Sequence, residues 1–152
     1  MAGQLVQVAT NTVSSPVSSV TLTGIDSDDL YMVAVSGTAQ TTSNYDWADK
    51  FLRASASFIN DYATNQTKTR ALNNTGDSGG EGSNGIFYLY NFNNASEYSF
   101  MTIENVTENG TEARGYEGGT VYTVAEAHNG IQFLNDTTGN ITSGTFTMYR
   151  VV

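Results

Sequence analysis

The chain has 152 residues, a size suited to one domain with a single core, and 39% of its residues are hydrophobic. Only six residues are Lys or Arg and the net charge is −9, which argues against binding to nucleic acid or to anionic membranes. The absence of cysteine excludes disulfides and thiolate metal sites, and we expect folding in a reducing cytoplasm. The N-terminal residues lack the basic start and apolar run of a signal peptide, and no stretch approaches the ~20 apolar residues of a membrane span.

The chain begins with a stretch that differs from the rest. Residues 1–15 mix single apolar residues with Thr, Asn and Ser, which predicts an extended N-terminal arm or an edge strand. Pro16, the only proline, marks the entry to a domain that we place at residues 16–152. The abundance of Thr, Tyr, Asn and Gly there favours strands joined by tight turns.

Seven or eight strands are predicted from period-two alternation and short apolar blocks. The block at 30–35 (LYMVAV) is continuous, which indicates a strand buried on both faces. The runs that alternate or are apolar lie at residues 20–25, 30–35, 86–92, 98–106, 120–125, 131–134 and 145–152. Their spacing predicts an all-β fold, a single antiparallel β-sandwich of the jelly-roll type.

Two segments are harder to assign. Residues 45–58 fit a helical stripe as well as a strand face, and the all-β composition of their surroundings favours a strand. Residues 64–85 are almost wholly polar and predict a long loop. Further turns are expected at 107–119 and at the His-Asn-Gly of 128–130.

Tyr45 and Trp47 form the pair that we nominate for contact with a ligand or partner. On a strand they share one side, where aromatic faces can stack on sugar rings or anchor a protein contact. The alternative is that Trp47 belongs to the core, and the sequence does not decide between the two.

Residues with catalytic or metal-binding chemistry form no recognisable constellation. His128 is the only histidine, and its Asn-Gly neighbours predict an exposed turn residue. A zinc site cannot be assembled from one His and no Cys, and the acidic run at 26–29 lacks the later Gly and Glu of a calcium loop. Carboxylates such as Glu97, Glu104 and Glu117 could support glycoside hydrolysis only if two lay close together. We therefore expect no enzyme activity, no cofactor and no metal.

Three stretches, SSVTLTGIDSDDLYMVAV (18–35), GIFYLYNFNNASEYSFMTIENV (85–106) and GNITSGTFTMYRVV (139–152), resemble small all-β virion proteins of tailed marine bacteriophages, cyanophages included. The resemblance spans nearly the whole chain. It implies a jelly-roll-like virion component that is made in the host cytoplasm and located on the virion surface. It carries over no functional residues.

Two binding roles follow from these expectations. The first is a capsid decoration protein on the phage head, a homo-oligomer in which the 1–15 arm adds a strand to a neighbour. The alternative is a tail fibre or adhesin module that binds a host surface glycan through Tyr45, Trp47 and Asn-rich loops. The partners in either case are phage capsid or tail proteins, with neither nucleic acid nor membrane. A tail glycosidase is a third and weaker hypothesis.

Overall fold

A computed structural model describes residues 3–41, 45–53, 58–60, 70–76, 82–108, 110–135 and 139–152, with the backbone alone at 45–53, 58–60 and 70–74. Within these residues the chain is all-β, without a helix, as the composition predicts. Accordingly, no helix in the described part is long and apolar enough to cross a membrane. The strands are β1 (Leu5–Val13), β2 (Ser19–Thr23), β3 (Tyr31–Gln40), β4 (Tyr45–Arg53), β5 (Phe58–Asn60), β6 (Arg70–Thr75), β7 (Gly82–Tyr90), β8 (Ser99–Glu108), β9 (Ala113–Tyr122), β10 (His128–Asn135) and β11 (Ile141–Val151).

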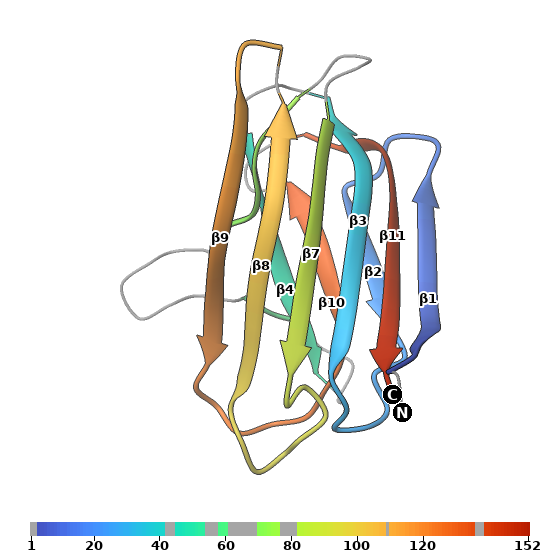
Figure 1. The fold of residues 1–152 in the computed structure, drawn as a ribbon, viewed down its shortest axis with the longest axis vertical. Coiled ribbons are helices and arrows are strands. Elements are labelled where there is room, and N and C mark those ends of the chain that lie inside the picture. Colours follow the sequence, from blue (N-terminus) through green and yellow to red (C-terminus); the bar gives the residue numbers. More distant parts are fainter. Residues whose placement is uncertain are drawn as a thin grey trace.

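The strands form two antiparallel sheets (Figure 1). A six-stranded sheet has the order β1-β11-β3-β7-β8-β9, and a five-stranded sheet has the order β2-β10-β4-β5, with β6 also paired to β4. Strands from the two ends of the chain pair in a nested way, β1 with β11, β2 with β10, β3 with β7 and β4 with β5. The β8–β9 hairpin lies outside this nesting and extends one side of the six-stranded sheet.

The core lies between the two sheets. The ring of Phe133 on β10 packs edge-on against Phe87 on β7, with centroids 5.1 Å apart, and lies tilted against the ring of Phe146 on β11 at 5.4 Å. Alternate residues of the facing strands are buried around this trio because side chains of a strand point to opposite faces in turn. The two sheets therefore share one apolar layer.

Several predicted elements need correction. The block at 30–35 buries one face only, since Tyr31, Val33 and Val35 are buried while Met32 and Ala34 are half-buried. The expected loop at 64–85 contains β6 and the start of β7, although 61–69 and 77–81 lie outside the described residues. The expected turn at 107–119 is largely strand, because β8 runs to Glu108 and β9 begins at Ala113. Cross-strand pairing there outweighs the turn preference of three glycines.

The remaining uncertain segments are strands. The strand interpretation of 45–58 is confirmed for 45–53 and 58, with 54–57 outside the described residues. Residues Leu5–Val13 form the edge strand β1, paired to β11 along its length, which is one of the two forms that the sequence allows for 1–15.

Candidate functional site

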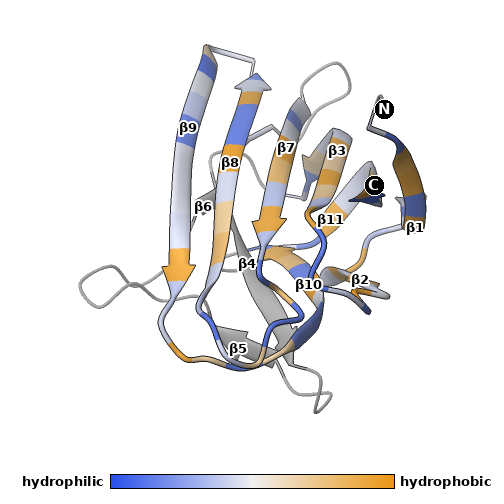
Figure 2. Ribbon diagram, turned by 60° about the horizontal axis from the view of Figure 1, so that its bottom comes forward, coloured by the Kyte–Doolittle hydropathy of each residue, from blue (hydrophilic) through white to orange (hydrophobic). Residues whose placement is uncertain are grey.

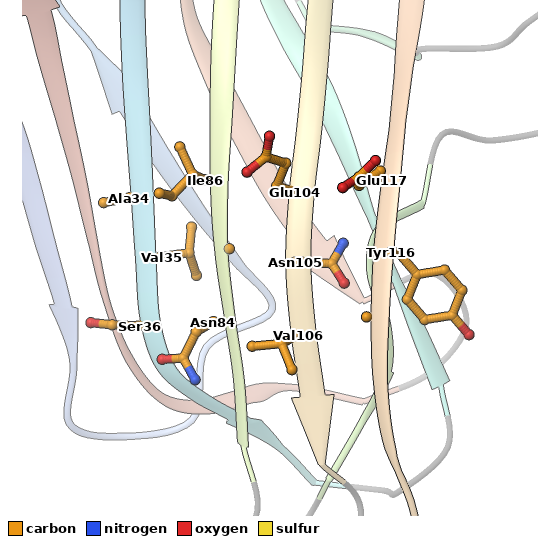
Figure 3. A pocket seen from close by; sticks show the side chains of 12 residues that line it. Ala34, Val35, Ser36, Asn84, Ile86, Glu104, Asn105, Val106, Tyr116 and Glu117 are labelled. Carbon is orange, nitrogen blue, oxygen red and sulfur yellow. The ribbon is translucent and has the colours of Figure 1, made fainter.

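A groove of about 690 Å3 lies on the six-stranded sheet (Figure 3). It crosses β3, β7, β8 and β9, and most of its lining faces away from the five-stranded sheet. One row of side chains runs straight across it, from Ala34 through Ile86 and Glu104 to Glu117, because these residues are register partners.

The alternation of β7 and β8 explains why the groove faces solvent. Phe87 on β7 and Met101 on β8 point into the core and are 0% and 1% exposed, so the residues that alternate with them along each strand point outward. Ile86, at 37% exposure, and Val106, at 52%, are accordingly open to solvent and give the groove apolar walls.

Asn84 is a polar group of the groove whose orientation is fixed by a hydrogen bond. Its Oδ1 accepts a hydrogen bond of 3.0 Å from the backbone N–H of Gly37, where the β3–β7 register shifts. Gly37 has φ +63°, a conformation that few residues with a side chain adopt, so this irregularity depends on glycine. The anchored amide leaves its Nδ2 end oriented and able to donate to a ligand.

Two carboxylates face each other across β8 and β9. Glu104 and Glu117 are direct register partners, both are exposed and both line the groove. Like charges placed directly opposite repel, so this pair favours a ligand that donates hydrogen bonds or carries positive charge. Of the three carboxylates considered for glycoside hydrolysis, the structure thus brings two together. Glu97 lies elsewhere, where it accepts a hydrogen bond of 3.0 Å from Asn91.

Arg114 lies on the same hairpin as this pair. Its guanidinium forms an ion pair with Glu112, and hydrogen bonds to Tyr116 and Glu112 raise its pKa above the usual value. The positive charge of Arg114 is therefore paired with Glu112, which lies just before the start of β9.

An apolar row continues the sheet face beyond the groove. Tyr90, Phe100 and Val121 are register partners on β7, β8 and β9, with exposed fractions of 37%, 43% and 40%. We call these three residues the aromatic row. Figure 2 shows the hydrophobic colour at this end of β9, whereas most of the strand is pale or blue. Apolar side chains gathered on an open sheet face are typical of a binding surface.

Tyr45 and Trp47, the predicted contact pair, lie on β4 of the other sheet. Their backbones pair with Thr75 and Leu72 of β6, and the register shifts between them. Their side chains are outside the described residues, so their role stays a prediction. The strand that carries them belongs to a different sheet from the groove.

His128 is not the exposed turn residue that its neighbours predict. It begins β10, is 0% exposed and lies between the rings of Phe92 and Tyr122, each with a centroid distance of 5.4 Å. Its Nδ1 is 3.0 Å from Ser99 Oγ, and that hydroxyl donates to the carbonyl of Asn91. Ser99 is itself fully buried, so this Ser–His pair lies in the interior and connects β8 to β10.

The Asn-Gly beside His128 is part of a strand for a steric reason. A Cβ on Gly130 would lie 2.3 Å from the carbonyl oxygen of Leu22, so only glycine allows β2 and β10 to approach this closely. Turn propensity read from the local sequence cannot detect this contact.

The acidic turn at 26–29 is held together by protein groups. The Tyr31 hydroxyl accepts hydrogen bonds from the backbone N–H groups of Asp26 and Ser27 and donates one to Asp26 Oδ1 at 3.1 Å. Arg150 lies 3.7 Å from Asp26 and 3.9 Å from Asp29. No group of three or more metal-binding side chains occurs in the described part of the chain, and these carboxylates already have protein partners.

Comparisons with protein-family models and with curated protein sequences find no match for this chain. Of the residues that line the groove, the sequence indicated only Glu104 and Glu117 as candidate site residues. The alternation at 99–106 does carry a signal, since a glutamate sits among apolar residues of period two, but only the sheet order shows what lies opposite it.

Proposed function

We propose that the fold is a jelly-roll β-sandwich. An eight-stranded jelly roll is a long antiparallel hairpin wound into two facing sheets, so that its first strand pairs with its last and each inner pair follows in turn. The nested pairs of β1/β11, β2/β10, β3/β7 and β4/β5 support this assignment. The β8–β9 hairpin and β6 are then additions to the eight-stranded plan.

We further propose that the protein is a non-enzymatic structural protein of a bacteriophage virion, a capsid decoration protein on the head surface. The observation that carries this is the solvent-facing side of the six-stranded sheet, where the aromatic row and the walls of the groove expose apolar side chains. A rigid sheet that presents such a face can dock on another protein with little ordering cost.

The partner that fits is a capsid or tail protein with a neutral or basic surface. The net charge of −9 repels nucleic acid and anionic membranes, and the carboxylates of Glu104 and Glu117 lie within the proposed docking face. Synthesis in the host cytoplasm followed by assembly on the virion surface agrees with a chain that has no cysteine.

The test is to mix the purified protein with undecorated phage heads and with isolated tails and to image both by electron microscopy. We expect saturating, regularly spaced density on heads. Phe100→Asp, which puts a charge into the aromatic row, should abolish that density. Leu5→Asp is the matched control, since Leu5 is also apolar and 53% exposed but lies on β1 at the opposite edge of the sheet. Density confined to tails contradicts head decoration.

The second candidate is a tail adhesin that binds a host surface glycan, and the groove favours it. Anchored Asn84, the facing carboxylates and the apolar walls offer hydrogen-bond partners and flat surface to an uncharged sugar chain. Glu104→Gln and Asn84→Ala should then reduce binding on a glycan array at least tenfold, with Glu97→Gln as the control outside the groove. Release of sugar fragments by the wild type, lost in Glu104→Gln, would instead support the glycosidase hypothesis.

A further inference from the structure

The strand β9 forms an open edge of the six-stranded sheet (Figure 1). All ten of its residues pair with β8 without a register shift. No strand in the described part of the chain pairs with its other side. Along about 34 Å of backbone, β9 therefore has a side that no described strand covers, and such an edge is a template for a further strand.

The opposite edge of the same sheet is not open in this way. β1 has a register shift between Gln7 and Ala9, and a bulge twists an edge away from further pairing. The chain then turns back so that β1 also packs on β2, and backbone hydrogen bonds between Gln4 and Val152 tie its start. The two edges thus differ, although both belong to one sheet.

β9 also lacks two of the features with which soluble proteins block an edge, although it carries the charged residues Arg114 and Glu117. It contains neither proline nor lysine, and the only proline of the chain is Pro16. None of its residues is buried, and it packs mainly on β8. The strand extends the sheet beyond the nested pairs, and its apolar contact with the core is made by Tyr122 at its C-terminal end, so core formation accounts for only that end of the strand.

We propose that β9 pairs antiparallel with β9 of a second copy of this chain, so that two six-stranded sheets join into one continuous sheet. A two-fold axis perpendicular to the sheet makes one strand serve both sides of the contact. This symmetry keeps the two outer faces on the same side, so the grooves and aromatic rows of both copies would face one partner together.

The charges and glycines of β9 select the register. A two-fold axis through Glu117 would place two carboxylates opposite each other, which is unfavourable. An axis through Gly118 instead sets Glu117 opposite Gly119 of the partner subunit, where no side chain competes for space. Gly118 suits the centre, because a Cβ at this position would meet no atom within 4 Å in its own subunit.

Single-cysteine variants provide the sharpest test, since the chain has no cysteine of its own. Gly118→Cys, incubated with oxidised glutathione, should give a disulfide-linked dimer for most of the protein, because the two sulfurs meet at the axis. Thr12→Cys, exposed on the β1 edge, is the control and should stay monomeric on a non-reducing gel. Cross-linking of Thr12→Cys instead of Gly118→Cys, or of neither variant, overturns the proposal.

Sedimentation equilibrium gives an independent measurement without cross-linking. The wild type should be dimeric, Gly118→Lys should weaken self-association at least tenfold, and Thr12→Lys should leave it unchanged, with all three showing the same far-UV circular dichroism spectrum. A wild type that stays monomeric up to its solubility limit contradicts the inference. The inference goes beyond head decoration and is tested on the isolated protein, so failure to bind phage heads would leave it standing.

Discussion

The two faces of β7 and β8 are built from neighbouring residues, but one face is buried and the other is exposed to solvent. On the inner face, Phe87 and Leu89 are 0% exposed and pack in the layer between the sheets. On the outer face, Ile86 and Phe100 are just as apolar but remain open to solvent at 37% and 43%. The apolar character of a residue therefore does not tell which face is the core, and the outer face carries the apolar residues of the docking surface that we propose.

The largest expected effect contrasts one phenylalanine on each face. Phe87→Ala should lower the free energy of unfolding by about 3–5 kcal/mol, since it leaves a cavity beside Phe133. Phe100→Ala should change it by less than about 1 kcal/mol, because its ring is largely solvated in the monomer. Urea unfolding, fitted with a common m-value, measures both. Equal losses would mean that the outer face is also packed against something under the conditions used.

The next contrast uses two strand glycines. Gly130→Ala should destabilise the protein by about 1–3 kcal/mol, since the new Cβ must push against the carbonyl of Leu22. Gly118→Ala, on β9, meets no neighbour and should be neutral or stabilise by up to about 1 kcal/mol. Thermal melts at a protein concentration where both are in the same oligomeric state compare them. A neutral Gly130→Ala would refute the close approach of β2 and β10.

A smaller effect is expected where the inner face ends in a polar turn. Tyr31→Phe removes the hydroxyl that binds the backbone of Asp26 and Ser27, and it should cost about 1–2 kcal/mol. Tyr149→Phe, half-buried on the neighbouring strand, should cost less than about 0.5 kcal/mol. Urea unfolding measures both variants. Repeated with calcium, it should give unchanged unfolding midpoints if protein groups alone hold the turn, and a rise in the wild-type midpoint would indicate a cation site there.

The smallest effect belongs to the outer face. Glu104→Gln should stabilise the fold by about 0.2–0.5 kcal/mol at low ionic strength, because it removes the repulsion from Glu117. The gain should vanish in concentrated salt, where the repulsion is screened. Destabilisation by this substitution would show that the carboxylate makes a favourable contact in the folded protein.

Much of the fold could be predicted from local pattern, and the failures have physical causes. Period-two alternation located β2 and β8, since each has one buried face. β6 and the first part of β9, residues 113–119, were missed because Asn, Gly and Thr favour turns, and only cross-strand pairing keeps such residues extended. His128 was wrongly predicted to lie in an exposed turn because Asn129 and Gly130 favour turns. The glycine is instead required by the close approach of β2 to β10.

For the candidate site, the sequence supplied residue types but no neighbours. It indicated Glu104 and Glu117 as candidate carboxylates without showing which residue lies near them. It also predicted a contact pair, Tyr45 and Trp47, which lies on the other sheet. Thirteen positions separate the two glutamates in the chain, and only the register of the β8–β9 hairpin sets them opposite each other. The amide of Asn84 likewise acquires its fixed orientation from Gly37, which lies 47 residues away.

The sequence by itself determined the all-β class, the absence of disulfides and the acidic character, because these depend on composition and on alternation within single strands. The tertiary structure decided which of two apolar faces became the core, which polar segments became strands and which edge of the sheet stayed open. Each of those outcomes depends on contacts between segments far apart in the chain. Such contacts leave no periodic trace in either segment, so no reading of one strand at a time could supply them.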